Sequence, residues 1–362
     1  MISPHQRVLL STGKYRRIED LQANDDVLDA TGMSRQVRSI VPSDDYMGVV
    51  YVTTKKSMNR VDISRRNSIL VVQREERKKR QNKENNANKN AGIRKQIDPN
   101  LIDDVYDVGV GGVGIDFDYN FDYNSNFRFT STIPLWIPVQ NIIIGRHAVA
   151  PIDLTKNVPH SLSLFSYSQG FIMGAFLTSG CRRFDDKQTW SQFILDVRNP
   201  YFERKLLHCL VIVHSEELTD IMQKLSWDEK NIENSQIKKL NVFSICLEHL
   251  VRDVNESSRD LPEAFMTYGR ECLRGIYDSL LHTNHYYSNN LVYDLCMYLE
   301  CLFGDTNETL RKRGDFIEIA KEHPEGCGKT VNMVFTDTDE NFTSLICDHI
   351  PIATFPNGGK MK

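Results

Sequence analysis

Two apolar segments with small residues four positions apart constrain the fold of this chain more than any other feature. In FIMGAFLTSG, Gly174 and Thr178 fall on one face of a helix. In LPEAFMTYGRECLRGIYDSL, Gly275 and Ser279 have the same spacing. Residues four apart are neighbours on a helix surface. Because small side chains there allow two backbones to approach closely, we expect the two segments to form helices that pack against each other.

The two segments resemble the motif helices of LAGLIDADG homing endonucleases. Residues 261–280 match the second helix with its lead-in, and residues 171–180 match the first. In that family the motif ends in Asp-Gly, and the Asp holds a divalent metal at the scissile phosphate. Here Leu280 and Leu281 stand at those two places in the second segment, and Ser179 stands at the place of the acid in the first. An ordinary buried helix is the alternative for residues 171–180.

The replaced acids bear directly on the chemistry that the resemblance implies. Metal-assisted phosphodiester cleavage needs carboxylates at the helix ends to hold the ions. Mg²⁺ is the cofactor implied by the family, but these residues predict no bound metal and no cleavage of DNA. Asp278 is the only acidic motif residue left, and the family's geometry implies that it caps the helix end and faces away from the metals. Two motifs in one chain predict a monomer.

The first 40 residues have a different pattern, of short strands and tight turns. Residues 8–10 and 14–16 flank Ser11-Thr12-Gly13, which predicts a hairpin. This order resembles the opening of the Hint fold, the horseshoe of β-strands found in inteins. Met1 then stands where an intein has its nucleophile, and a thioether cannot attack the preceding carbonyl. A Met introduced in place of a native first Cys is an alternative.

Further positions extend the comparison with inteins. VDISRRNSILVV resembles the strand that carries a Thr-x-x-His, with Ser64 for the Thr and Asn67 for the His. Asn cannot act as a general base near neutral pH. Residues 331–350 resemble the last intein strands, with His349 for the His and Ile350 for the Asn that cyclises. The same segment is equally typical of an edge strand and turn. The resemblance implies a chain that no longer splices.

Together these patterns predict a multidomain chain. We expect an all-β Hint-like horseshoe in residues 1–155, with a disordered insertion at about 73–130, completed by strands in residues 329–362. Residues 160–328 are expected to form an α+β LAGLIDADG-type domain, a pseudo-twofold αββαββα arrangement with one motif helix in each half. The whole resembles freestanding endonucleases of the HO type, without their C-terminal zinc module. Helical apolar spacing occurs at residues 171–177, 202–213, 240–251 and 291–303.

The composition is that of an ordinary globular protein, with 40% hydrophobic and 25% charged residues. No stretch is apolar for long enough to span a bilayer, and the start lacks a secretory pattern. We therefore expect an intracellular protein without a membrane partner, nuclear if its source is eukaryotic. The 8 cysteines form no Cys-x-x-Cys pair, so neither a zinc ribbon nor a disulfide framework is indicated. His147 is expected to be a surface or strand-packed histidine rather than a catalytic one.

Charge is unevenly distributed along the chain. Residues 1–100 contain 20 Lys+Arg and 12 Asp+Glu, whereas the remainder contains 24 and 36. Cations that neutralise phosphates supply much of the affinity for duplex DNA, so an acidic endonuclease-like part disfavours strong binding. The run Arg77-Lys78-Lys79-Arg80 is a weak candidate for a DNA-backbone or nuclear-import patch, and a solvated insertion is the alternative. Glycines at 109–114 lack the Lys-Ser/Thr of a phosphate loop and predict a flexible or β-hairpin insertion.

Two functions remain open from the sequence. The first is an intein-derived, LAGLIDADG-like chain that has lost both protein splicing and cleavage of double-stranded DNA. The second is a non-enzymatic scaffold that binds DNA or another protein.

Overall fold

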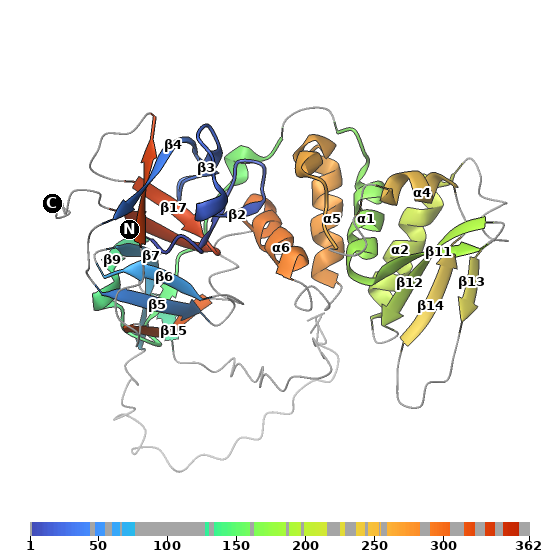
Figure 1. Ribbon diagram of the computed structural model, residues 1–362. Coiled ribbons are helices and arrows are strands. Elements are labelled where there is room, and N and C mark those ends of the chain that lie inside the picture. The colour runs from blue at the N-terminus through green and yellow to red at the C-terminus, as the bar shows by residue number, and fades with distance from the viewer. Residues whose placement is uncertain are drawn as a thin grey trace, which may run out of the picture.

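The computed structural model of the chain consists of two parts that lie side by side (Figure 1). A β-domain is formed by residues before 160 together with those after 314, and a helical domain is formed by residues 163–304. The structure describes residues 2–43, 48–54, 60–65, 67–76, 127–129, 134–159, 163–185, 188–196, 199–215, 225–228, 237–242, 245–252, 254, 259–282, 290–304, 315–322, 330–336 and 343–354. The predictions for Met1, the basic run at 77–80 and the glycines at 109–114 lie outside the described residues.

The β-domain is built from strands drawn from both ends of the sequence. Its strands are β1 (Arg7–Leu9), β2 (Tyr15–Arg17), β3 (Asp26–Leu28), β4 (Ser34–Ser43), β5 (Val49–Thr54), β6 (Val61–Ser64), β7 (Ser68–Glu76), β8 (Phe127–Phe129), β9 (Leu135–Pro138), β10 (His147–Val149), β15 (Asp315–Glu322), β16 (Thr330–Phe335), β17 (Thr343–Cys347) and β18 (Ile350–Thr354). The main sheet runs in the order β2-β1-β17-β18-β7-β10-β15-β5-β6, with β8 and β9 also on β7, and β16-β4-β3 form a smaller sheet. The 3-10 helices η1 (Ile18–Asp20) and η2 (Val139–Asn141) lie between strands, and η3 (Thr155–Asn157) follows β10.

The hairpin predicted at the start of the chain is confirmed. Strands β1 and β2 pair with Val8 opposite Arg16 and Leu9 opposite Tyr15. Gly13 sits in the connecting turn with φ of +82°, a conformation that only glycine adopts without strain. Three turn residues were therefore enough to predict where this hairpin lies in the sequence. The hairpin carries several residues of the candidate site.

The helical domain contains helices α1 (Tyr167–Ser179), α2 (Pro200–Val213), α4 (Ile245–Val251), η4 (Glu263–Tyr268), α5 (Arg270–His282) and α6 (Asn290–Phe303), and strands β11 (Gly180–Asp185), β12 (Gln188–Asp196), β13 (Leu225–Asp228) and β14 (Ile237–Val242). The four strands form one sheet in the order β11-β12-β14-β13. Helix α1 begins with a capping box, in which Ser166 and Gln169 each satisfy the other's backbone N–H. From α1 to α4 the elements follow the order αββαββα.

The second half of the helical domain differs from the expected pseudo-twofold arrangement. Among the described residues, α5 is followed by α6 and then by β15, with no second sheet in the helical domain. Strand β15 falls inside the predicted 160–328 domain, but it pairs with β5 and β10 of the β-domain. The predicted helix at 240–251 is also divided, because its first part belongs to β14 and only the later residues form α4. Apolar spacing over a short run did not distinguish a buried strand from a helix.

The two domains meet at α6, which lies between the β-strands and α5 (Figure 1). Leu9, Leu154 and Ile346 of the β-domain belong to the same apolar core as the helices. The hairpin turn also packs closely, because a Cβ on Gly13 would lie 2.6 Å from Cε1 of Tyr298. The interface is thus a continuous core rather than a linker.

Candidate functional site

Helices α1 and α5 approach so closely that glycine is required on both. A Cβ on Gly174 would lie 2.7 Å from Cβ of Ser279, and one on Gly275 would lie 2.2 Å from the carbonyl oxygen of Tyr167. Gly170, which the sequence analysis did not single out, is tighter still, since its Cβ would lie 2.0 Å from the carbonyl oxygen of Cys272. The small residues thus serve backbone contact between the two helices.

The end of α1, where the resemblance places a metal-binding acid, is held by hydrogen bonds to the protein itself. Ser179 is buried, and its hydroxyl donates to the carbonyl oxygen of Ala175 at 2.9 Å. The guanidinium of Arg259 donates to the carbonyl oxygen of Phe176 at 3.0 Å and also to that of Gly180. A cation at this position complements the negative end of the helix dipole.

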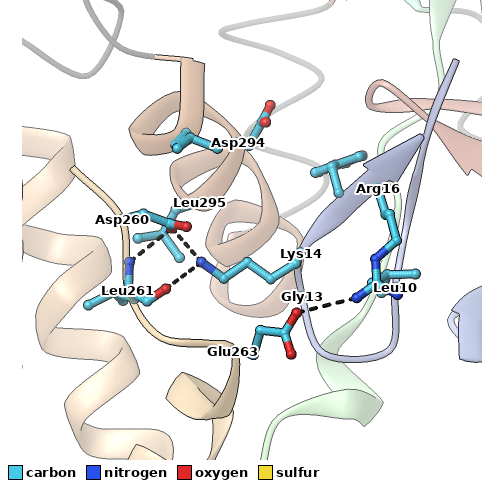
Figure 2. A pocket seen from close by; sticks show the side chains of 11 residues that line it. Leu10, Gly13, Lys14, Arg16, Asp260, Leu261, Glu263, Asp294 and Leu295 are labelled. Carbon is cyan, nitrogen blue, oxygen red and sulfur yellow. Dashed lines mark hydrogen bonds and ion pairs between the residues drawn. The ribbon is translucent and has the colours of Figure 1, made fainter. Parts of the chain in front are cut away.

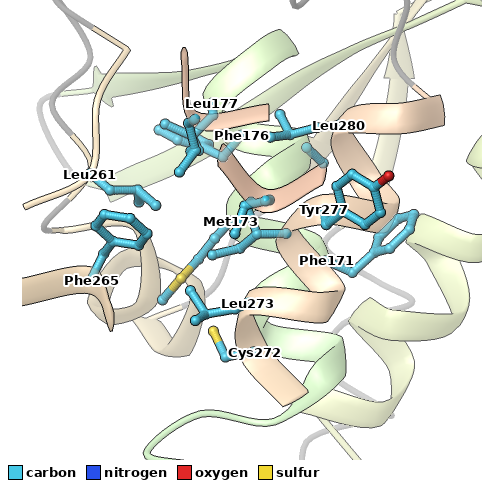
Figure 3. Packing of buried hydrophobic residues seen from close by; sticks show 14 of the residues in the cluster. Phe171, Met173, Phe176, Leu177, Leu261, Phe265, Cys272, Leu273, Tyr277 and Leu280 are labelled. Carbon is cyan, nitrogen blue, oxygen red and sulfur yellow. The ribbon is translucent and has the colours of Figure 1, made fainter. Parts of the chain in front are cut away.

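The corresponding place on α5 is apolar. Leu280 is fully buried in the same apolar core as Phe176 of α1 (Figure 3). Asp278 instead accepts a hydrogen bond from the hydroxyl of Tyr167 at 2.9 Å and pairs with Arg274 at 3.1 Å. The carboxylate of Asp278 therefore links α5 to α1 through Tyr167 and forms an ion pair within α5 with Arg274.

These residues do not fit the divalent metal that the family implies. The described residues contain no group of three or more His, Cys, Asp or Glu side chains placed to hold a metal ion. At the motif ends, a hydroxyl that already donates to Ala175 and a buried Leu280 replace the ligands. The guanidinium of Arg259 already binds the carbonyl oxygens at the end of α1. Its positive charge would repel a divalent cation bound at that helix end. We derive no step through a metal.

The intein-equivalent residues of the β6–β7 turn are packed inside the β-domain. Ser64 and Asn67 are each 1% exposed. The backbone N–H of Asn67 donates to the carbonyl oxygen of Ser64 at 2.9 Å, and its own carbonyl oxygen accepts from the N–H of Val139 at 3.0 Å. Ile2 bridges Ile63 and Val331, so the described start of the chain lies beside this turn.

His349 occupies a tight hairpin turn away from Asn67. Cys347 pairs with Ile350 across this turn, and Asp348 and His349 have φ of +43° and +69°. Strand β18 continues from Ile350 and meets β7 at Ala353, opposite Ser68. At about 3.3 Å per strand residue, His349 is roughly 13 Å along the strand from that point. The structure therefore does not bring His349 to Asn67.

The imidazole of His349 is held at the domain interface instead. Its Nδ1 lies 2.7 Å from the hydroxyl of Tyr15, and its Nε2 lies 3.0 Å from Oδ1 of Asp294 on α6. A carboxylate only accepts hydrogen bonds, so Nε2 carries a proton. When the imidazole is neutral, Nδ1 accepts from the phenol of Tyr15. The ring also packs edge-on against Tyr15 and Tyr293.

Arg7 joins two carboxylates in the same place. Its Nη1 donates to Asp294 at 2.5 Å and its Nε donates to Asp348 at 2.7 Å. We call Arg7, Tyr15, Asp294, Asp348 and His349 the interface cluster. All its acidic and basic side chains are at least partly buried, so each charge depends on its partner.

Burial and charge shift several pKa values in the interface cluster. Burial alone would raise the pKa of Asp294, but its hydrogen bond with His349 and the charges of His349 and Arg7 outweigh it, and the pKa lies below its ordinary value. Burial likewise would lower the pKa of Arg7, yet Asp348 and Asp294 raise it. Burial raises the pKa of Tyr15 well above its ordinary value.

A pocket of about 210 Å³ lies beside the interface cluster (Figure 2). Lys14 crosses it to Asp260 and to the carbonyl oxygen of Leu261, and Arg16 reaches Glu263 at 3.3 Å. Its wall is formed by Leu10, Gly13, Lys14, Tyr15, Arg16, Asp260, Leu261, Glu263, Leu291, Asp294 and Leu295. Charged groups and leucines from both domains thus line one small cavity.

The sequence pointed to His349 but not to the other residues of the interface cluster. Arg7 and Asp348, for example, are 341 positions apart, and no local pattern connects them. Asp294 did carry a signal, because it is the one acidic residue within the apolar run LVYDLCMYL, and a carboxylate on a buried face needs a partner. His147 is buried beside its strand as expected, with Nδ1 accepting from the N–H of Ile143 at 3.0 Å.

No protein-family model matches this sequence, and no match to it is found among curated proteins. None of the helices in the described residues is long and apolar enough to cross a membrane. The resemblances to LAGLIDADG endonucleases and to inteins therefore stay predictions from the motif residues.

Proposed function

We propose that this chain is a scaffold derived from an intein-encoded LAGLIDADG endonuclease, and that it neither cleaves DNA nor splices. The observation that carries the proposal is the chemistry at the ends of the two glycine-packed helices. Arg259 binds the carbonyl oxygens at the end of α1, and Leu280 is buried in the core on α5. The close packing through Gly174 and Gly275 is present, whereas metal-holding carboxylates are replaced at both ends.

The proposed loss of splicing rests on three residues of the β-domain at positions that inteins use for splicing. Ile350 has no amide to cyclise, and it pairs with Cys347 in a hairpin that continues into β18. His349 binds Tyr15 and Asp294 rather than a splice junction. Asn67, at the place of the intein histidine, is fully enclosed in its turn.

The scaffold role follows from how the two domains are joined. One apolar core runs from the β-domain into the helices, and the interface cluster adds buried ion pairs across the same boundary. Such a body presents fixed surfaces to a partner. Duplex DNA is the weaker candidate partner, because residues 160–303 contain 14 Lys+Arg against 19 Asp+Glu.

A nicking assay tests the loss of cleavage. Supercoiled plasmid carrying random target sequences is incubated with the full chain in Mg²⁺ or Mn²⁺, beside an Asp278→Asn variant. We expect no metal-dependent conversion to open-circular or linear plasmid with either protein. Conversion that Asp278→Asn abolishes would refute the proposal, because it would show a working carboxylate in the motif.

Retention on duplex DNA separates the two kinds of partner. Real phosphate contacts give a log–log dependence of affinity on salt with a slope of about −0.9 for each phosphate neutralised. A scaffold for proteins should show weak retention with a slope near zero. A slope steeper than about −4 would instead favour a DNA-binding module.

A further inference from the structure

The interface cluster contains a tyrosine, a histidine and an aspartate in hydrogen-bonded series. The phenol of Tyr15 donates to Nδ1 of His349 at 2.7 Å, and Nε2 of His349 donates to Asp294 at 3.0 Å. A nucleophile within hydrogen-bond reach of a base, with the base oriented by a third group, is the arrangement that activates hydroxyl nucleophiles. The three residues come from β2, a hairpin turn and α6.

The neighbouring charges act differently on the phenol of Tyr15 and on the imidazole of His349. Asp294 would stabilise the imidazolium that forms, because its carboxylate already accepts from Nε2. At the phenol, burial and the charges of Asp294 and Asp348 raise the pKa of Tyr15, and the guanidinium of Arg7, 5.4 Å from the ring centre, partly offsets them. Because burial raises the pKa of Tyr15, the phenol is neutral at rest and must lose its proton as a new bond forms.

This tyrosine forms part of the wall of the pocket. Tyr15 and Asp294 line its wall, and Glu263, whose side chain is 71% exposed, brings the pocket to the protein surface. Leucines 10, 261, 291 and 295 supply an apolar lining. The cavity of about 210 Å³ lies below the range of roughly 300–1,000 Å³ typical of small-molecule pockets, so it suits a compact ligand.

We propose that Tyr15 is a base-activated nucleophile that reacts with small, apolar acyl or sulfonyl electrophiles in this pocket. The phenolic oxygen attacks the acyl carbon or the sulfur, and the bond to the leaving group breaks as the new bond forms. The phenol proton passes to Nδ1 of His349, and the leaving group departs as an anion. His349 is the general base, and Asp294 positions it. This inference does not depend on the proposed function, since neither motif helix takes part.

Phenylmethanesulfonyl fluoride is a suitable probe, because attack by Tyr15 forms a sulfonate ester and releases fluoride. The full chain is treated with the probe, and labelled peptides are quantified over time by mass spectrometry. Two other tyrosines provide internal references. Tyr51 also has an arginine, Arg60, 5.4 Å from its ring centre, and Tyr167 donates to a carboxylate, Asp278. General-base assistance contributes about 100-fold or more, so Tyr15 should be labelled at least about 100-fold faster than either reference.

Variants separate the chemistry from mere accessibility. His349→Gln should slow labelling of Tyr15 about 100-fold and leave Tyr51 and Tyr167 unchanged. Tyr167→Phe, outside the interface cluster, should leave the Tyr15 rate unchanged. Equal labelling of Tyr15 and the references in the unmodified chain would overturn the proposal, whether or not the variants fold. Fast labelling of Tyr15 that survives in a folded His349→Gln protein would overturn the role of the base.

Discussion

Nη1 of Arg259 lies 3.0 Å from the carbonyl oxygen of Phe176, at the end of helix α1 where the LAGLIDADG resemblance places a metal-binding acid. The same guanidinium reaches the carbonyl oxygen of Gly180. A protein cation thus occupies the neighbourhood that an endonuclease would use for a metal cation. The arrangement stabilises the helix end, and it sets the expectations for restoring the lost acids.

Leu280→Asp should destabilise the protein instead of restoring a metal site. Leu280 is 0% exposed, and an unpaired carboxylate placed in such a core costs several kcal/mol or stays protonated. We expect a loss of at least about 3 kcal/mol in the free energy of unfolding, measured by chemical denaturation. Leu280→Met, which keeps the apolar volume, should cost less than about 1.5 kcal/mol. Stabilisation of Leu280→Asp by Mg²⁺ would show a metal site that the proposed function does not allow.

Substitution of the interhelical glycines should destabilise the protein more, the closer the added methyl group lies to the facing helix. Gly174→Ala would place a methyl group 2.8 Å from the carbonyl oxygen of Ile276, and Gly170→Ala would place one 2.0 Å from that of Cys272. Overpacking typically costs about 1–3 kcal/mol, so we expect that loss for Gly174→Ala and a larger one for Gly170→Ala. Gly48→Ala is the control, because its nearest contact would be Arg65 Cδ at 3.7 Å. Equal denaturation midpoints for all three variants would contradict the close helix approach.

The hairpin turn offers a test of the domain interface. Gly13→Ala would combine a φ of +82° with a contact of 2.6 Å to Tyr298, whereas Gly145→Ala would have a φ of +74° and nothing within 4 Å. Left-handed strain costs about 1–2 kcal/mol in either variant. We therefore expect Gly13→Ala to lose clearly more stability than Gly145→Ala in thermal unfolding. Equal losses would mean that the turn does not pack on α6.

Asp294 should make the free energy of unfolding depend on pH in the acidic range. Because its pKa in the folded protein lies below the ordinary value, its contribution is fully present above the unfolded pKa of about 3.9. It is lost as the pH falls through the lower folded pKa. Asp294→Asn removes the buried anion beside His349 and leaves Arg7 with Asp348 as its remaining buried anion, so we expect a loss of about 3 kcal/mol at pH 7. That difference from the unmodified protein should shrink below pH 4, and a difference constant from pH 7 to pH 2 would contradict this account.

Local turn chemistry and helical spacing predicted several elements well. Ser11-Thr12-Gly13 between residues 8–10 and 14–16 predicted the β1–β2 hairpin, and small residues four apart marked the contact face of α1. The sheet to which a strand belongs was harder to predict. Strand β15 joins β5 and β10 by pairing across more than 160 residues of sequence, and alternation within the strand contains no information about its partner.

The interface cluster shows the same limit for the site. His349 was found through a family motif, but its partners Tyr15 and Asp294 come from elements that lie far apart in the sequence. Only the isolated acid in an apolar helix hinted that a buried cation or donor must face it. Tertiary packing, which brings these elements together, decides the chemistry of that histidine.

The most direct test of the central claim is to map DNA ends after incubation of a random-sequence plasmid library with the full chain in Mg²⁺ and in Mn²⁺. Sequencing of captured ends detects rare cuts at any site. The proposed function predicts the same distribution of ends as in a control with chelator. A set of ends that share a sequence, require the metal and disappear in Asp278→Asn would contradict it.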